Sequence, residues 1–269
     1  MNPAGVDVFE EGWDTLVILD ACRHEALERY DLPGRLEARE SRGSMTVEFL
    51  RGNFLDRDLT DVVYVTATPQ LHRVANPSEF SLHAVVNLWQ DDDNYWWASD
   101  GRHCVPPERT TEYAIQTARR FPKKRLIVHY TQPHIPFMNP ADETLETDAN
   151  PYRAYTDGRL DVDPDALRES YYRNVEVALP AVEKLLKTVD GKTVVTADHG
   201  HLLGERVWPI PVRMWGHPHG IYVDELVTVP WLVYTNGERR EIVADPPVNT
   251  VSVDERTVTD RLDALGYRT

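Results

Sequence analysis

Short apolar runs bounded by turn residues recur along the chain and predict the strands of a buried sheet. Each run has five residues, too few for a surface helix but enough for a strand covered on both faces. The runs are 15–19, 62–66, 84–88, 126–130, 193–197 and 230–234. Between and after them, the spacing of apolar residues predicts helices over 23–30, 46–52, 107–120 and 165–187, and a short closing helix over 258–267. The alternation predicts the α/β class, as a three-layer αβα sandwich around a mostly parallel, doubly wound sheet.

Two long stretches, 90–107 and 133–165, interrupt this alternation with Pro, Asp and aromatic residues. We predict loops there, because connections of that length usually act as functional lids or mobile surface segments. The 269 residues show no internal repeat, no low-complexity tract and no change in composition that would mark a linker. We therefore expect a single catalytic domain over residues 1–269.

The charge balance excludes nucleic acid as an expected partner. Asp and Glu number 44 against 29 Lys and Arg, giving a net charge of −15, whereas a protein that neutralises phosphates needs a basic face. At 41% hydrophobic residues the chain has enough apolar side chains for a globular core. Only five of the basic residues are Lys. A carboxylate-rich, lysine-poor surface suits high salt, so we expect a protein from a salt-adapted organism, with an ordinary acidic protein as the alternative.

The cysteine and hydropathy patterns indicate a cytoplasmic protein. Cys22 and Cys104 lie far apart and imply no disulfide framework. The first residues lack a basic region followed by an apolar run, and no stretch reaches the roughly 18 apolar residues of a membrane span. We therefore expect reduced cysteines and no membrane partner.

Polar residues that follow two predicted strands are the first candidates for chemistry. Asp20 follows 15–19, and Asp198 and His199 follow the run that ends at Ala197. Ligands bind at the carboxyl ends of the strands in doubly wound sheets, and Gly200 permits a sharp turn there. Oxygen and nitrogen ligands together favour Zn or Mn over Ca for a divalent ion at this place. In the alternative interpretation, such strand-end acids merely cap the next helix.

Several segments resemble the alkaline phosphatase superfamily, in its sulfatase-like and phosphoglycerol-transferase-like branch. The segment TVVTADHGHLLGE resembles the T-(S/A)-D-H-G-x-x-x-G-E signature, and LVILDACR resembles the opening strand with its metal-binding acid. The segments HYTQPHIPF, GHPHGIYVDELVTVPWLVY and the closing L-x-x-L-G-Y are similar to later elements of that branch, in the same order. The resemblance spans about residues 13 to 267 and implies an alkaline-phosphatase-like fold.

The resemblance also implies a metal site and a small anionic phosphate- or sulfate-ester substrate. It assigns the metal, a divalent Mn, Zn or Ca ion, to Asp20, Asp198, His199 and His217, with His219 as the alternative to His217. His134 would contact the substrate. Asp20 is followed by Ala21 where sulfatases have paired aspartates, so one metal ion is expected rather than two.

The resemblance places an attacking oxygen in the segment ESRGSMTVEFLRGNF. Ser44 is the first candidate, because G-S-M-T-V-E-F resembles a pattern whose nucleophile lies four residues before Glu, and Thr46 is the second. A divalent ion would lower the pKa of such a hydroxyl, and the N-terminus of the following helix would favour the anion. Either residue could instead simply cap that helix, with Glu48 supporting it.

The combined pattern predicts a metal-dependent hydrolase or transferase that acts on phosphate or sulfate esters through a Ser or Thr nucleophile. The sulfatase signature C-x-P-S-R is absent from the sequence, so true sulfatase activity is not expected. The alternative is a non-catalytic module with the same fold that binds a metal or an anion. Esterase chemistry without a cofactor ranks last, because no G-x-S-x-G motif occurs.

Overall fold

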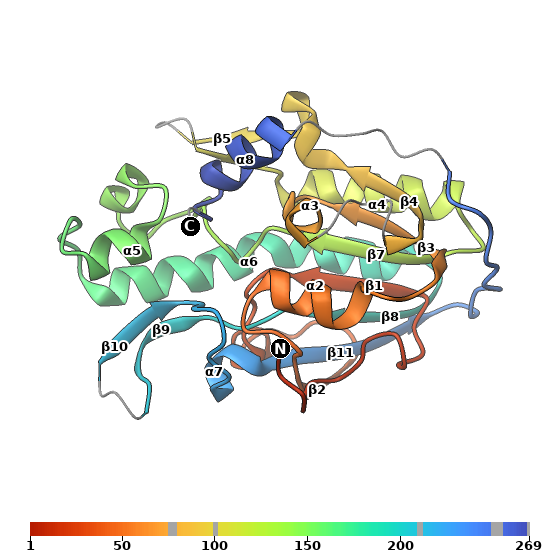
Figure 1. Cartoon of the computed structure of the whole chain (residues 1–269), viewed down its shortest axis with the longest axis horizontal. Coiled ribbons are helices and arrows are strands. Elements are labelled where there is room, and N and C mark those ends of the chain that lie inside the picture. The colour runs from red at the N-terminus through yellow and green to blue at the C-terminus, as the bar shows by residue number, and fades with distance from the viewer. Residues whose placement is uncertain (75–79, 99–101, 209–211, 249–254, 268–269) are drawn as a thin grey trace.

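A seven-stranded, mostly parallel sheet forms the centre of the molecule (Figure 1). The computed structural model describes residues 1–74, 80–98, 102–208, 212–248 and 255–267. The strand order is β2-β11-β8-β1-β7-β3-β4, and β11 runs antiparallel to both of its neighbours. The strands are β1 (Thr15–Leu19), β2 (Arg35–Glu40), β3 (Leu59–Thr66), β4 (Leu82–Asn87), β7 (Arg125–Tyr130), β8 (Gly191–Thr196) and β11 (Thr228–Asn236).

The predicted α/β class and mostly parallel sheet are confirmed, and each of the six apolar runs falls on a strand of this sheet. The seventh strand, β2, was not predicted. Its sequence RLEARE is charged and only partly buried, because β2 lies at the edge of the sheet and pairs with β11 alone. An edge strand needs no continuous apolar run, so its sequence carries little signal.

Helices cover both faces of the sheet and complete three layers (Figure 1). On β1, Val17 and Leu19 join a core with α1 (His24–Glu28), α4 (Pro107–Arg120) and α6 (Pro164–Thr188). Leu16 and Ile18 point to the opposite face, as alternate residues of a strand do, and join a core with α2 (Thr46–Phe54) and α3 (Gln70–Val74). Burial on both faces explains why the runs are continuously apolar.

The two predicted long loops contain regular structure, so this part of the prediction is wrong. The first holds the two-stranded ladder of β5 (Trp96–Trp97) and β6 (His103–Cys104), and the second holds α5 (Pro151–Thr156). Buried Leu145 and Tyr152 anchor the second stretch to a third apolar core. Short anchors separated by polar residues give no periodic pattern, which explains the missed elements. The remaining elements are β9 (Leu202–Arg206), β10 (Arg213–Gly216), α7 (Asp224–Val227), α8 (Glu255–Ala264) and the 3-10 turns Leu88–Gln90, Asp92–Asn94 and Glu143–Thr147.

Both cysteines are free and buried, with Cys22 just after β1 and Cys104 in β6. Burial raises the pKa of each thiol to about 12, so both are poor nucleophiles at neutral pH. Within the part of the chain that the structure describes, no helix combines the length and the apolar character needed to cross a membrane.

The topology brings three strand ends to one place. β1 pairs in parallel with β8 on one side and with β7 on the other. The residues that follow these three strands therefore meet at the same edge of the sheet. Asp20 follows β1, Asp198 follows β8, and the segment that carries His134 follows β7.

Candidate functional site

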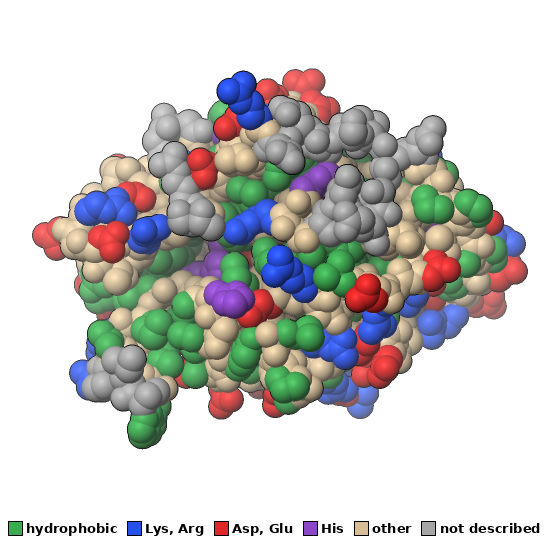
Figure 2. All heavy atoms as spheres, in the orientation of Figure 1, with side chains coloured by type: hydrophobic (Ala, Val, Ile, Leu, Met, Phe, Trp, Pro, Cys, Tyr) green, Lys and Arg blue, Asp and Glu red, His purple; other side chains and the backbone are tan. Residues whose placement is uncertain are grey.

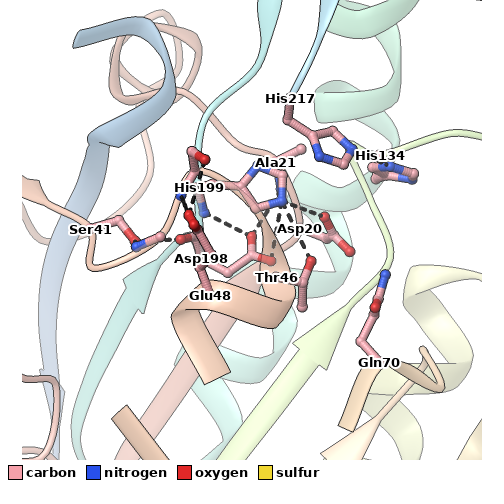
Figure 3. Close-up of polar contacts among 12 residues, drawn as sticks. Asp20, Ala21, Ser41, Thr46, Glu48, Gln70, His134, Asp198, His199 and His217 are labelled. Carbon is pink, nitrogen blue, oxygen red and sulfur yellow. Dashed lines mark hydrogen bonds and ion pairs between the residues drawn. The ribbon is translucent and has the colours of Figure 1, made fainter. Parts of the chain in front are cut away.

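Asp20, Asp198 and His199 converge at this edge and form what we call the acid–histidine cluster (Figure 3). One ligand atom from each lies within 4.8 Å of the others. His199 Nε2 is 3.5 Å from Asp20 Oδ1 and 3.4 Å from Asp198 Oδ2. All three side chains are fully buried.

Two unusual backbone positions hold the cluster together. Ala21 has a φ of 65°, in the left-handed region, and its N–H donates to Asp198 Oδ1 over 3.1 Å. Gly200 follows His199, and its N–H donates to Leu226 O over 2.7 Å. A Cβ atom at Gly200 would lie 2.1 Å from the backbone oxygen of Glu225, so only glycine fits this turn. The turn after β8 thus depends on a close approach of backbones.

The hydrogen bonds of His199 fix which of its nitrogens faces the two acids. Nδ1 lies 2.7 Å from Gly200 O, and because a carbonyl only accepts, Nδ1 carries the proton. The lone pair of Nε2 therefore faces the acids. Among the described residues, Asp20 Oδ1 and Asp198 Oδ2 are buried without a hydrogen-bond donor. Two unpartnered carboxylate oxygens and a ring-nitrogen lone pair that face one another fit a bound cation.

The pKa shifts of the three side chains in the cluster also favour a bound cation. Burial, and then the charge of Asp198, raise the pKa of Asp20 well above its ordinary value. Burial also raises the pKa of Asp198, while it lowers the pKa of His199 to about 4. His199 is thus neutral near pH 7 and provides no positive charge for the carboxylates. A divalent cation would compensate both, so the residues fit a metal ion.

Thr46 brings a hydroxyl to the cluster. It is the first residue of α2, is 1% exposed, and places Oγ1 3.4 Å from His199 Nε2 (Figure 3). The nearby Thr46 hydroxyl also lowers the pKa of Asp198, against the larger effect of burial. The helix N-terminus supplies unpaired N–H groups and a positive dipole end at this position.

Ser44 lies in a different set of contacts. Its hydroxyl donates to Glu48 Oε2 over 3.0 Å or to Pro218 O over 3.1 Å, and accepts from Gly220 N–H over 3.1 Å. The Ser44 N–H donates to the same Glu48 oxygen over 2.9 Å. Among the described residues, no hydrogen-bond partner of the Ser44 hydroxyl belongs to the cluster. The cap position of α2 is Met45 and no side chain caps the helix there, so Ser44 contacts Glu48 in the first turn of α2 without capping the helix as the sequence alternative had it.

His134 and His217 form a pair beside the cluster. Their Nε2 atoms are 3.0 Å apart, and the His217 ring centroid is 4.5 Å from that of His199. His134 Nδ1 donates to Ile135 O over 2.9 Å, so the proton between the rings lies on His217 Nε2. Burial, and then repulsion from His217, lower the pKa of His134 well below its ordinary value. Burial, and then repulsion from His199, lower the pKa of His217 in the same way. His217 Nδ1 is buried without a partner among the described residues.

The other sequence candidates lie outside the cluster. His219 is 72% exposed and contacts Glu48 Oε1 over 3.0 Å, so of the two alternatives only His217 lies next to the cluster. Arg23 forms ion pairs with Glu205 over 2.6 Å and with Glu25 over 3.1 Å.

A cavity of about 730 Å³ opens beside the cluster, and we call it the aromatic cavity. His134, His217 and Tyr267 line it on the side of the cluster, and Tyr152 and Trp215 line it farther out. Figure 2 shows histidine side chains in a hollow near the middle of one face, with basic side chains beside them. Pockets of this size commonly hold small-molecule ligands.

Sequence reasoning missed two residues of the site. The Tyr267 hydroxyl donates to Asp20 Oδ2 over 2.7 Å, although the only signal in the sequence was the closing L-x-x-L-G-Y segment. His201 is 2% exposed, lines the aromatic cavity and stacks on Tyr171. Its place between the motif residues Gly200 and Gly204 gave no reason to expect a role.

Comparisons with known proteins find similar folds. No family model and no curated protein matches the chain. The C-terminal periplasmic domain of EptC from Escherichia coli, solved in complex with Zn, has a TM-score of 0.55 and 16% identity, over 87% of this chain and 77% of that domain.

Two further solved structures are more distant. Lipooligosaccharide phosphoethanolamine transferase A from Neisseria meningitidis, an integral membrane protein, has a TM-score of 0.49 and 11% identity over 82% of this chain. The chain spans 47% of the length of that protein. A putative sulfatase from Bacteroides thetaiotaomicron has a TM-score of 0.43 and 12% identity, over 95% of this chain and 71% of that one. The chain therefore has the fold of the EptC domain, and the alkaline-phosphatase-like fold that the sequence resemblance implied is confirmed.

Proposed function

We propose that this protein is a metal-dependent enzyme that acts on phosphate esters, with Thr46 as the nucleophile. One observation carries the proposal: Asp20 Oδ1 and Asp198 Oδ2 lie 3.5 and 3.4 Å from His199 Nε2, and the Thr46 hydroxyl lies 3.4 Å from the same nitrogen. The sequence resemblance to the sulfatase-like and phosphoglycerol-transferase-like branch, together with the fold shared with the EptC domain, supports ester chemistry of this kind. Sulfate esters are the second substrate class, since their reacting oxygens carry similar charge.

The cation is proposed to be a single divalent ion held by Asp20, Asp198 and His199. Among the described residues, these form the one group of His, Cys, Asp and Glu side chains that could hold a metal. A nitrogen ligand favours Zn or Mn over Ca. The Zn complex of the EptC domain supports Zn. His217 adjoins the group and is proposed to contact the substrate or to complete the ligand set.

A divalent cation in this place would lower the pKa of the Thr46 hydroxyl and draw charge from a phosphoryl oxygen. Thr46 Oγ1 attacks phosphorus, the bond to the alcohol oxygen of the ester breaks, and the proton that Thr46 loses leaves with the alcohol. Water, or a second alcohol in a transferase, then attacks the phosphothreonine and releases Thr46. The N-terminus of α2 stabilises the oxygen anion during both steps.

The histidine pair is proposed to steady the phosphoryl group. His134 and His217 line the cavity next to the cluster, and both are neutral at pH 7 because burial lowers their pKa values. A neutral ring brings no second full charge beside the cation, and the His217 N–H, which donates to His134 Nε2 in the structure, is proposed to turn to the phosphoryl group when substrate binds. Its place between the cluster and the cavity suits a hydrogen bond to a nonbridging oxygen or to the leaving alcohol.

The direct experiment measures metal content and turnover of p-nitrophenyl phosphate, bis-p-nitrophenyl phosphate and p-nitrophenyl sulfate in high salt. We expect turnover of a phosphate ester that depends on a divalent ion. The Thr46→Ala variant should lose at least about 100-fold in kcat, because covalent catalysis is removed, whereas Thr46→Ser should retain part of it.

Ser44→Ala is the matched variant, since Ser44 lies two residues away in the same segment. It removes the hydrogen bond to Glu48 and leaves the Thr46 hydroxyl in place. Loss of turnover in Ser44→Ala with survival in Thr46→Ala would move the nucleophile to Ser44. Stoichiometric metal binding without turnover of any of the three esters would favour the non-catalytic module.

A further inference from the structure

The aromatic cavity carries a charge opposite to that of the molecule. The chain has 44 acidic against 29 basic residues. The described side chains lining the cavity include Arg73, Arg153 and Arg213 and a single acid, Asp157. Within a strongly acidic protein, a cavity with this lining attracts anions selectively.

Two of these arginines have no acidic partner among the described residues. Arg73 donates to Gln70 Oε1 over 3.3 Å, and Arg213 donates to Gly204 O over 3.1 Å, so both contacts are to neutral acceptors. Asp157, in contrast, lies 3.8 Å from Arg153 and 3.6 Å from Arg159, so its charge is already compensated. Within the part of the chain that the structure describes, Arg73 and Arg213 are thus two positive charges without an acidic partner, and both can pair with a ligand.

The far wall of the cavity suits a flat ring. The rings of Tyr152 and Trp215 lie 24° from parallel with centroids 6.1 Å apart. His201 lines the cavity beside Tyr152, with ring centroids 4.5 Å apart. Both His201 nitrogens and the Tyr152 hydroxyl are buried and, within the described residues, have no hydrogen-bond partner. Buried polar atoms of this kind need a partner, which a ligand in the cavity would supply.

We propose that the aromatic cavity binds the alcohol half of the ester and selects an alcohol with a ring and a negative charge of its own. The substrate class is then a phosphate ester with a second anionic group, a carboxylate or a second phosphate, on a ring-bearing alcohol. The reacting phosphate lies at the acid–histidine cluster, and the second anion pairs with Arg73 and Arg213. This inference rests on the proposed function, because it assumes that the reacting phosphate lies at the cluster.

The test compares 4-carboxyphenyl phosphate with 4-carbamoylphenyl phosphate, two esters of similar shape that differ by one negative charge. The metal-loaded protein is assayed at the lowest salt at which it stays folded, because screening weakens the contrast. We expect kcat/KM to be about tenfold higher for the carboxylate, the effect of one charge near two partly exposed arginines. In the double variant Arg73→Gln/Arg213→Gln the ratio should fall to about 1.

The matched control is Arg35→Gln, on the edge strand β2, where the arginine is 79% exposed and does not line the cavity. It should keep the wild-type ratio. A wild-type ratio near 1, or a ratio that persists in the double variant, would overturn the inference and leave the proposed function standing.

Failure of the proposed function has a separate signature. If the metal-loaded protein turns over neither these two esters nor any of the three p-nitrophenyl esters, the ester chemistry fails. The charge preference is then decided by calorimetric binding of 4-carboxybenzylphosphonate against 4-carbamoylbenzylphosphonate, which needs no turnover. Tighter binding of the carboxylate, lost in the double variant, supports the inference, and equal binding overturns it.

Discussion

The Tyr267 hydroxyl donates a 2.7 Å hydrogen bond to Asp20 Oδ2 and so connects the C-terminal end of the described chain to the acid that follows the first strand. The Tyr267 ring also stacks on His134, with centroids 4.4 Å apart and an interplanar angle of 8°. Because Oδ2 is occupied by this donor, Oδ1 is the Asp20 oxygen that faces His199. Tyr267 therefore acts as a positioning residue for the acid–histidine cluster.

Tyr267→Phe should weaken metal binding without removing the ring that stacks on His134. A hydrogen bond to a charged group contributes about 1.5–3 kcal/mol, so we expect the Kd for Zn or Mn to rise by roughly tenfold or more. Calorimetric titration measures the affinity, and the visible spectrum of the Co-loaded protein reports a change in ligand geometry. Tyr222→Phe is the matched control, since Tyr222 donates to Glu48 outside the cluster. Unchanged affinity and spectrum in Tyr267→Phe would exclude the positioning role.

Asp20→Asn should stabilise the protein in the absence of metal while it weakens metal binding. Burial and the charge of Asp198 raise the pKa of Asp20, so its folded state holds a proton that the unfolded state has lost. The stability from this group is present below pH 4 and is lost as the pH rises through the raised folded pKa. Asparagine does not ionise, so Asp20→Asn avoids this loss of stability, and its side-chain oxygen still accepts the hydrogen bond from the Tyr267 hydroxyl. At pH 8 we expect a gain of at least about 1 kcal/mol, a few degrees in Tm, shown by thermal unfolding with chelator. A gain that does not grow from pH 4 to pH 8 would contradict the electrostatic cause.

The central sheet could be predicted from sequence because its strands are buried on both faces. The run Thr15–Leu19 is buried at every position, and four of its five residues are apolar because helices cover both sides. The edge strand Arg35–Glu40 and the helix Pro151–Thr156 could not be predicted in this way. They are held by pairing with β11 and by a few anchors such as Tyr152, and these contacts are tertiary rather than periodic.

The site is predictable to the extent that the topology alone determines it. Asp20 and Asp198 follow neighbouring parallel strands, so their proximity follows from the sheet order. The choice between Ser44 and Thr46 depends on side-chain directions in the turn before α2, and sequence spacing does not contain that information. The Tyr267 contact joins residues 247 positions apart, through a tail whose docking no local pattern encodes.

His129 should make the protein sensitive to acid. It lies in β7, fully buried, with Nδ1 2.6 Å from the Tyr64 hydroxyl, and burial lowers its pKa from 6.5 to about 4. The unfolded state binds a proton below pH 6.5 while the folded state does not. Stability is therefore present above pH 6.5 and is lost as the pH falls toward 4, by up to about 3 kcal/mol.

The His129→Gln variant removes this titration and keeps a polar partner for Tyr64. We expect its Tm to fall less than that of the wild type between pH 6.5 and pH 4, with chelator present in both cases. His219→Gln, at a histidine that is 72% exposed, is the control and should follow the wild-type curve. Parallel Tm curves for wild type and His129→Gln would show that His129 does not cause the acid sensitivity.

Gly200→Ala should damage the metal site and the fold together. The added Cβ would lie 2.1 Å from Glu225 O, a backbone atom that cannot rotate away, and would break the approach in which Gly200 N–H donates to Leu226 O. Relief of the clash requires the turn after β8 to move, which displaces Asp198 and His199 from Asp20. We expect a loss of about 1–3 kcal/mol in stability and at least a tenfold weaker metal affinity. Thermal unfolding and metal titration measure the two effects.

Gly12→Ala is the matched control, because a Cβ there meets nothing within 4 Å, and it should change neither quantity. If Gly200→Ala retained the wild-type Tm and metal affinity, the close approach of the two backbones would not be what holds the acid–histidine cluster in place.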